Sequence, residues 1–369
     1  MEERNTRKNR NIVEAKVPRL PPRGIGREAL LPELTAAHAA IGELRGFIGS
    51  LQNPDLLIAP FRRREAVASS AIEGTRATLD DVMEFEAKDD QRVKEHDTKT
   101  QDIHEIINYE RAMGVALREM VIRPIGENLL KTTHDTLLHS VRGQSKDRGS
   151  FRRAQVRVGD YIPPVHTDVP ELIKNWEEYL NAEDEPDPLI RIGVAHYQFE
   201  AIHPFLDGNG RIGRLIIPLF LCQVGILQTP VLYISHYLEK YKVEYQRLLH
   251  NVDLRQDWNP WLKFFLKAVE EQAHMTTGMA KAIQALYEKL KMETVRDIRS
   301  RHAITVLDLI FKRPVITAAH VQSAIRASSK VTAYNLIDKF VKAGVLKHYL
   351  TISREKYFVF SDLRKIIRG

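Results

Sequence analysis

The stretch from Ile202 to Arg214 constrains this chain more than any other part of its sequence. It reads Ile-His-Pro-Phe-Leu-Asp-Gly-Asn-Gly-Arg-Ile-Gly-Arg and lies between two apolar segments, 189–200 and 215–221. The apolar spacing predicts a helix on each side and a tight polar loop between the two helices. Glycine and asparagine tolerate left-handed backbone, so the amides of residues 208–210 can turn toward one anion. The positive end of the following helix strengthens such an anion site.

Four titratable or charged side chains stand in this loop and just after it. His203 offers a proton acceptor and Asp207 an anionic ligand, while Arg211 and Arg214 share one face of the second helix. A Gly-Asn-Gly turn or a His-Pro pair alone is common in structural loops. The full pattern combines distinct chemical requirements at fixed spacing, and it predicts a site for a polyphosphate.

The same stretch resembles the signature of the Fic (filamentation-induced-by-cAMP) family, His-x-Phe-x-Asp/Glu-Gly-Asn-Gly-Arg-x-x-Arg. Its specified positions are all filled here, by His203, Phe205, Asp207, Gly208, Asn209, Gly210, Arg211 and Arg214. The resemblance implies that the chain transfers AMP from ATP to Tyr, Thr or Ser hydroxyls of proteins, including itself. Doc-type members, which transfer phosphate, carry a lysine where Gly210 stands, so this chain follows the AMP-transferring pattern.

The resemblance also implies a role for each of these residues. His203 is the catalytic base, and Asp207 is the ligand of Mg²⁺. The residues implied in ATP binding are Asp207, Gly208, Asn209, Gly210, Arg211 and Arg214. The chemistry agrees, since imidazole titrates near neutral pH and a carboxylate is a hard ligand for a hard cation. Phe205 is expected to pack under the loop.

A second segment predicts self-inhibition. The helix expected from Leu56 to Glu73 ends before Gly74, a residue favoured just past a helix C-terminus. A carboxylate at that end of a helix is unfavourable and favours a cationic partner. A capping box, Ser70-x-x-Glu73, is the structural alternative, but Gly74 argues against a helix start here. Ser69, Glu73 and Gly74 fit the family's inhibitory motif, Ser/Thr-x-x-x-Glu-Gly/Asn, which implies that Glu73 pairs with Arg214.

A short hairpin is expected upstream of the loop. Residues 155–158 alternate like a strand, Gly159-Asp160 suits a tight turn, and Tyr161-Ile162 begins a return strand. Together with Gly149-x-Phe151-Arg152, this segment resembles the family's flap, which holds the target. The flap residues are Val156, Val158, Gly159, Asp160 and Tyr161. An extended target peptide could add to such a hairpin as a further strand.

Two further features have alternative interpretations. Tyr237, Tyr241 and Tyr245 stand four apart and are expected on one face of a single helix. This stripe either packs the helical bundle or, as the resemblance implies for Tyr241 and Tyr245, lines the adenine pocket. His134 is expected in the bundle rather than in a site, because no second ligand stands at helical spacing from it.

The C-terminal residues predict a separate basic unit. Helices at 305–311, 317–327 and 330–343, followed by strands at 345–350 and 356–360, give the order of a winged helix-turn-helix. Residues 301–369 contain 13 Lys and Arg against 4 Asp and Glu, although the whole chain has a net charge of only +7. Such a basic unit suits duplex DNA. Winged helices also bind proteins, and the second motif helix has few side chains that read bases.

The sequence therefore predicts a mainly α protein: a Fic helical core with a short β-hairpin flap, plus a C-terminal winged helix-turn-helix. The expected division is an N-terminal helical region with the inhibitory helix (1–110), the catalytic core (111–290) and the winged helix (296–369). A single cysteine and the absence of a long apolar run or leader segment favour the cytoplasm and no membrane contact. The charged run 88–99 is expected to be a solvated connection.

The expected partners are ATP with Mg²⁺, protein hydroxyl side chains, a second copy of the chain in a homodimer, and DNA at the winged helix. Two other functions remain open from the sequence. The chain is a DNA-binding regulator with a nucleotide-sensing core, or Glu73 positions water to remove AMP from a modified protein.

Overall fold

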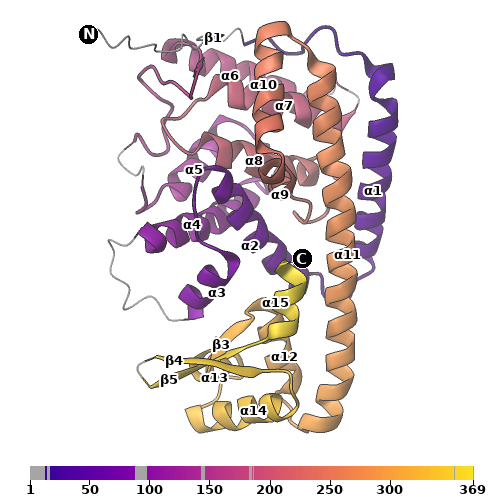
Figure 1. The fold of residues 1–369 in the computed structure, drawn as a ribbon, viewed down its shortest axis with the longest axis vertical. Helices are drawn as coiled ribbons and strands as arrows, with labels where there is room; N and C mark the ends of the chain where they lie inside the picture. The colour runs from indigo at the N-terminus through magenta and orange to yellow at the C-terminus, as the bar shows by residue number, and fades with distance from the viewer. Residues whose placement is uncertain are drawn as a thin grey trace, which may run out of the picture. The chain divides into compact units, whose positions relative to one another are not determined.

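The computed structural model describes residues 13–14, 17–87, 98–142, 146–182, 185, 187–352 and 354–368, and these are mainly helical, as predicted (Figure 1). Most of the predicted connection at 88–99 lies outside them. No helix among the described residues is long and apolar enough to cross a membrane. Contacts divide the chain into two compact units. The first comprises Met1–Thr35, Arg111–Val224 and Lys240–Lys267, and the second comprises Ala36–Glu110, Gly225–Glu239 and Ala268–Gly369. The three-domain division expected from the sequence stays a prediction.

The first unit is built around helix α7. Its elements are β1 (Val13–Glu14), η1 (Arg27–Leu30), α5 (Glu127–Leu137), β2 (Tyr161–Ile162), η2 (His166–Asp168), α6 (Val169–Asn181), α7 (Pro188–Ile202), α8 (Asn209–Gln223) and α10 (Lys242–Arg255). Helix α7 packs against α6, α8 and α10, and nearly all of its residues are buried. Trp176 Nε1 donates to the Ala195 carbonyl (2.8 Å), and Trp261 Nε1 donates to the Gly193 carbonyl (2.9 Å). Helix α7 is thus covered on nearly all sides, and it is the fixed support of the loop that follows it.

The second unit is built around helix α2. Its elements are α2 (Asp55–Ile72), α3 (Leu79–Ala87), α9 (Ser235–Lys240), α12 (Ala303–Lys312), β3 (Val315–Thr317), α13 (Ala318–Ala324), α14 (Lys330–Lys342), β4 (Lys347–Ile352), β5 (Glu355–Val359) and α15 (Ser361–Arg368). Helices α3, α12 and α15 all pack against α2. The buried Arg63 of α2 forms ion pairs with Glu86 (2.8 Å) and Glu110 (3.1 Å). Breaking one partner of such a buried pair is costly, so these bonds hold α2 in place.

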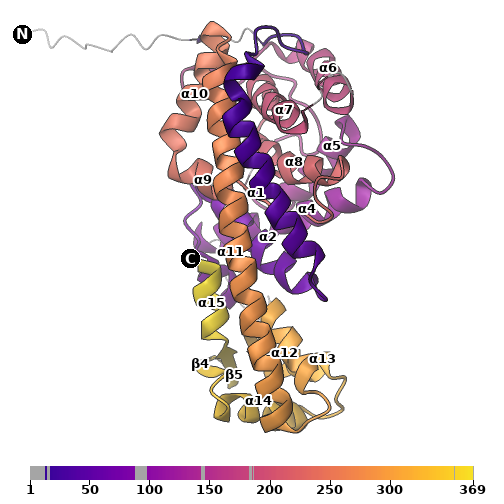
Figure 2. The same ribbon diagram turned by 90° about the vertical axis from the view of Figure 1, so that its right-hand side faces the viewer.

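Three helices have residues in both units: α1 (Leu31–Gly49), α4 (Thr98–Glu119) and α11 (Trp258–Ile298). Within the second unit, α1 runs beside α11 (Figure 2), and Lys281 Nζ lies 2.7 Å from Glu43 Oε1. Helix α1 belongs to the N-terminal region, 1–110, that the sequence predicts to be helical.

The C-terminal elements agree with the predicted order of three helices and two strands, with two additions: strand β3 before α13 and helix α15 after β5. Strand β3 pairs antiparallel with β5, which pairs antiparallel with β4, so the sheet order is β3-β5-β4. The sequence did not predict β3, because three residues are too few to show an alternating pattern. The assignment of this unit as a winged helix stays a prediction.

The expected continuous helix carrying Tyr237, Tyr241 and Tyr245 is wrong. Helix α9 ends at Lys240, and Tyr241 (φ −110°, ψ 34°) is the N-cap of α10. The three tyrosines therefore do not form one stripe, because the backbone leaves helical geometry at the middle one.

Candidate functional site

The loop between α7 and α8 has the predicted helix–loop–helix form. Asp187 caps α7 through its side chain, which accepts hydrogen bonds from the amides of Leu189 and Ile190. Helix α7 ends at Ile202, and His203 follows in the left-handed region (φ 49°, ψ 62°). Gly208 is also left-handed (φ 77°) and is the N-cap of α8. The chain thus reverses over six residues, 203–208, between two buried helices.

The backbone of His203 is held by Arg152. Arg152 Nε donates to the His203 carbonyl (2.9 Å), and the Arg152 amide donates to the Pro204 carbonyl (2.9 Å). The guanidinium also donates to the carbonyls of Ala154 (3.2 Å) and Pro164. Arg152 is almost fully buried, and burial lowers its pKa, although the hydrogen bonds keep it in place. Arg152 therefore joins the flap segment to the residue predicted to be the base. The sequence contained it in the flap pattern, but we did not predict it as a site residue.

The carboxylate of Asp207 lies between two cations. Lys146 Nζ is 2.9 Å from one carboxylate oxygen and Arg211 Nη2 is 3.5 Å from the other. Burial acts to raise the pKa of Asp207, but the hydrogen bond from Lys146 and the charges of Arg211 and Lys146 bring the pKa below its usual value. Asp207 is thus ionised at neutral pH.

The carboxylate oxygens of Asp207 suit a magnesium ion that is bound together with a nucleotide. The described residues contain no cluster of three or more His, Cys, Asp or Glu that could hold a metal by themselves. Mg²⁺ commonly takes one or two carboxylates and completes its shell with substrate phosphates and water. A single ionised carboxylate at a helix N-terminus meets that requirement.

The start of α8 carries the two arginines of the signature. Arg211 and Arg214 are both buried, at 4% and 2% exposure. The Asn209 side chain holds the loop, because its Oδ1 accepts from the Phe205 amide and its Nδ2 donates to the Phe205 carbonyl, both at 2.8 Å. Gly213 allows close packing, since a Cβ there would lie 2.3 Å from Glu200 Oε1. The arrangement places two cations at the positive end of a helix, which favours an anion.

His134 of α5 packs against this loop and supports it. The sequence did not predict this contact. Its ring stacks on Phe205 with centroids 3.8 Å apart and planes 8° apart. Nδ1 accepts a hydrogen bond from the Gly149 amide (3.0 Å), so the proton of the neutral ring is on Nε2 and is donated to the Asp207 carbonyl (3.0 Å). His134 is therefore buried in the bundle, as expected, but it also joins α5, the flap segment and the loop. Phe205 is fully buried, which confirms its expected packing.

Burial lowers the pKa of His134 to about 4, which gives a testable pH dependence. Between the usual value of 6.5 and about pH 4 the unfolded chain binds a proton at this residue and the folded chain does not. The free energy of unfolding should therefore fall as the pH is lowered through that range, by up to about 3 kcal/mol. Urea unfolding across this range measures the slope. This pH slope should be smaller in His134→Gln than in the wild type. It should be unchanged in His139→Gln, which replaces an exposed histidine nearby. Equal slopes in all three proteins would show that His134 does not cause the pH dependence.

The tyrosines implied in adenine binding have different surroundings. Tyr245 is buried and lies behind α8, where its hydroxyl donates to His196 Nε2 (2.8 Å) while His196 Nδ1 donates to the Gly213 carbonyl (3.1 Å). Tyr241 is 37% exposed. Tyr245 thus supports α8 through His196, and the nucleotide contacts of both tyrosines stay predictions.

The flap hairpin forms in a minimal version. Val158 and Tyr161 exchange two backbone hydrogen bonds (2.9 and 3.0 Å) around the turn Gly159-Asp160, but residues 155–157 do not continue the strand. On its other side, β2 pairs in parallel with β1, with Val13 opposite Tyr161. The return strand of the predicted hairpin therefore already has partners on both sides within the chain.

The segment predicted to be inhibitory ends its helix where the sequence predicts. Helix α2 ends at Ile72, Glu73 is its C-cap, and Gly74 is left-handed (φ 98°). The Thr75 amide donates to the Ser70 carbonyl (3.2 Å) and the Gly74 amide to the Ala71 carbonyl (3.0 Å), which is a Schellman motif. Ser70 lies inside α2, so the capping-box alternative is wrong. Ser69 is buried, Glu73 is exposed, and the pairing of Glu73 with Arg214 stays a prediction.

Comparisons with known proteins match this chain to one family. Residues 31–118 match the profile described as Fic/DOC family N-terminal, and residues 124–221 match the profile described as Fic/DOC family. The chain is 36% identical over 124 residues to "Protein adenylyltransferase Fic" of Culex quinquefasciatus, a match that covers 33% of this chain and 23% of that protein. The corresponding protein of Drosophila willistoni is 34% identical over 125 residues, covering 33% and 24%. The chain thus spans about a quarter of the length of these curated relatives.

A solved structure shares the fold over most of the chain. A Fic family protein from Desulfovibrio desulfuricans superposes with a TM-score of 0.57 at 23% identity, covering 89% of this chain and 96% of that one. At that identity the likeness concerns the fold alone, which is the predicted helical fold.

Proposed function

This chain belongs to the Fic/DOC family, and from that premise we propose that it is a protein adenylyltransferase. It transfers AMP from ATP to a Tyr, Thr or Ser hydroxyl of a protein, itself included. The hydroxyl oxygen forms a bond to the α-phosphorus, the bond from that phosphorus to the bridging oxygen breaks, and diphosphate leaves. The observation that carries the proposal is the complete loop: His203 is held by Arg152 beside a helix N-terminus that bears Arg211 and Arg214.

In this proposal His203 removes the proton from the attacking hydroxyl. A neutral imidazole suits this task near neutral pH. Arg152 positions His203 by donating a hydrogen bond to its backbone carbonyl. The proton goes to the imidazole and the oxygen attacks in line with the departing diphosphate. The residue therefore acts on the acceptor side of the reaction.

The residues of α8 and the loop bind the nucleotide. In this proposal the amides of Gly208 and Gly210, with Asn209, stabilise charge on the α-phosphoryl group, and Arg211 and Arg214 bind the β- and γ-phosphates. Asp207 is the residue that would hold Mg²⁺, which when bound neutralises phosphate charge. Tyr241 and Tyr245 contact the adenine in this proposal. Tyr245 also supports α8 through its hydrogen bond to His196.

The flap positions the target segment and Glu73 restrains the reaction. A target strand pairs along residues 156–158 or displaces β1 from β2, with the hydrogen bonds coming mainly from backbone groups.

Glu73 inhibits by pairing with Arg214, which then cannot hold the γ-phosphate. The sequence motif at Ser69, Glu73 and Gly74 and the cap geometry of α2 support this role.

The proposal is tested by incubating the full chain with ATP labelled in the α-phosphate and Mg²⁺. We expect covalent label on the protein, most strongly in Glu73→Gly, and no label when the γ-phosphate carries it instead. Label from the γ-phosphate would indicate phosphate transfer. An absence of label in every variant would contradict the proposal and favour a nucleotide sensor.

The basic C-terminal unit favours a second function, binding of duplex DNA. Residues 301–369 are strongly basic, and Lys330 and the exposed Val331 stand at the start of α14, which Ser329 caps. Fluorescence anisotropy with a labelled duplex should show binding that weakens steeply with salt. We expect Lys330→Gln to reduce the affinity and Lys289→Gln, on α11, to leave it unchanged. Binding that is independent of salt and of Lys330 would instead favour a protein-interaction module.

Removal of AMP from a modified protein is the third candidate. In it Glu73 orients a water molecule toward the phosphodiester. Release of AMP from a labelled target by the wild type but not by Glu73→Gly would support it.

A further inference from the structure

A cavity of about 470 Å³ lies in the second unit between α2 and the last helix, α15. Its apolar wall comprises Val67, Ala68 and Ala71 of α2, with Leu79 and Ile367 facing them. This volume lies within the range of clefts that hold small organic ligands, about 300–1,000 Å³. We call this cavity the α2–α15 pocket.

One arginine in the pocket has weak acceptors. The guanidinium of Arg64 donates to Met275 Sδ (3.1 Å from both Nη1 and Nη2) and to Met279 Sδ (3.1 Å from Nη1), and these thioethers are its hydrogen-bond acceptors among the residues that the structure describes. Sulfur is a weak acceptor. Burial lowers the pKa of Arg64, and only the charge of Glu65 opposes this shift.

The carboxylates near Arg64 have other donors. Glu65 accepts hydrogen bonds from the hydroxyls of Tyr109 (3.0 Å) and Ser235. On the opposite wall, Asp80 forms ion pairs with Arg364, whose Nε lies 2.9 Å away, and with Arg368. Asp80 is therefore satisfied by two arginines, and Arg64 remains the cation best able to accept an anionic partner.

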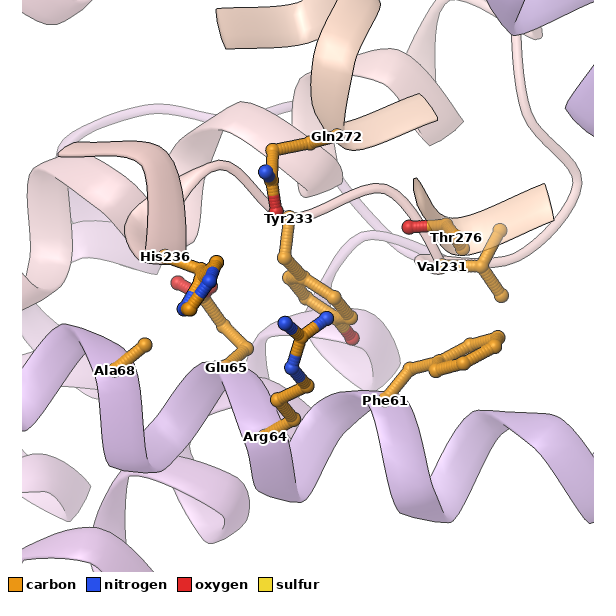
Figure 3. A pocket seen from close by; sticks show the side chains of 9 residues that line it. All are labelled: Phe61, Arg64, Glu65, Ala68, Val231, Tyr233, His236, Gln272 and Thr276. Carbon is orange, nitrogen blue, oxygen red and sulfur yellow. The ribbon is translucent and has the colours of Figure 1, made fainter. Parts of the chain in front are cut away.

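The inner end of the pocket is polar. A recess of about 20 Å³, with room for about one water molecule, shares Arg64, Ala68 and His236 with the pocket. Figure 3 shows the Arg64 side chain rising from α2 into this recess, with Tyr233 and Gln272 above it and His236 beside Glu65. Polar side chains thus line the end of the pocket where the guanidinium lies, and aliphatic side chains line the other end of the pocket.

We propose that the α2–α15 pocket binds a small amphipathic organic anion, whose carboxylate or sulfonate group pairs with Arg64 and whose apolar body lies on Val67, Ala71 and Ile367. The guanidinium of Arg64, which also lines the pocket itself, and the apolar wall match the two ends of such a molecule. Glu239, an exposed acid in the lining, disfavours a second negative charge on the ligand.

The pocket also links the ligand to inhibition, an effect that rests on the proposed function. Ala71 of α2 lies two residues before Glu73, the C-cap of that helix, and Leu79 and Asp80 begin the next helix, α3. A ligand held between α2 and α15 stabilises one position of α2, whose C-cap is Glu73. It therefore changes AMP transfer only by a chain that has Glu73.

The binding test uses the fluorescent anion anilinonaphthalene sulfonate and the full chain. We expect saturable binding at one site, weakened about tenfold or more in Arg64→Gln, as for loss of a hydrogen bond to a charged group. Ala71→Phe, which fills the pocket without changing a charge, should abolish this binding. Arg45→Gln, which removes an exposed arginine of α1, should leave it unchanged. Circular dichroism and thermal unfolding establish that each variant is folded.

Binding that is unsaturable, or that is equal in the wild type, Arg64→Gln and Ala71→Phe, would overturn the proposed site. The link to inhibition is tested separately by autolabelling with and without the probe. We expect the probe to change labelling by the wild type and not by Glu73→Gly; the same change in both would overturn the link. If no variant transfers AMP, the proposed function fails and the binding test still decides the site.

Discussion

His203→Ala is expected to lower AMP transfer by about 10²–10⁴-fold or more, with the affinity for ATP nearly unchanged. In the proposed mechanism the imidazole takes the proton of the acceptor hydroxyl, whereas the loop amides and the α8 arginines bind the phosphates. Transfer from ATP labelled in the α-phosphate measures the rate, and calorimetry measures ATP binding. His139→Ala, at an exposed position outside the loop, is the control that should retain activity.

The left-handed backbone of His203 requires a second variant. Alanine is less stable than histidine at φ 49°, so a loss of activity in His203→Ala could reflect a shifted loop. Asparagine tolerates the left-handed region and lacks a basic imidazole. His203→Asn should therefore bind ATP as the wild type does and be as inactive as His203→Ala. Near-native labelling by either variant would show that His203 is not the base.

Glu73→Gly is expected to raise AMP transfer, including autolabelling, by an order of magnitude or more. The carboxylate of Glu73 stands at the negative end of α2, where its own helix does not stabilise it. Pairing with Arg214 would satisfy the charge and leave the triphosphate without the anchor that in-line attack needs. Glu73→Gln keeps the length of the side chain but not its charge, so it should give much of the same increase.

The gain in Glu73→Gly should depend on Arg214. In the Glu73→Gly background, Arg214→Ala should lose most of the gained activity, because the γ-phosphate then has no anchor. The two changes are thus expected to be non-additive, as for residues that share one interaction. Autolabelling of the wild type, both single variants and the double variant measures this. Equal labelling of the wild type and Glu73→Gly would leave Glu73 as an ordinary helix-end residue.

The sequence was most informative where a few neighbouring residues decide the structure. Gly74 was predicted to stop a helix, and the Schellman motif there uses only residues 70–75. The α7–loop–α8 element was likewise predicted, because its two apolar helices and its glycines are contiguous. The prediction that three tyrosines share one helix face was wrong. Spacing alone does not show that the backbone leaves helical geometry at Tyr241.

The tertiary structure decided which distant residues support the site. His134 and Asp207 are 73 positions apart, and Arg152 and His203 are 51 positions apart, yet both pairs are hydrogen-bonded. Nothing local distinguishes His134 from the other histidines of the chain, because its role comes from the stacked Phe205 and from carbonyls that only folding brings near. The chemistry of the loop is thus encoded in one short stretch of sequence. Its rigidity depends on buried partners elsewhere, since a carbonyl oxygen is a good acceptor wherever it lies and only packing selects its donor.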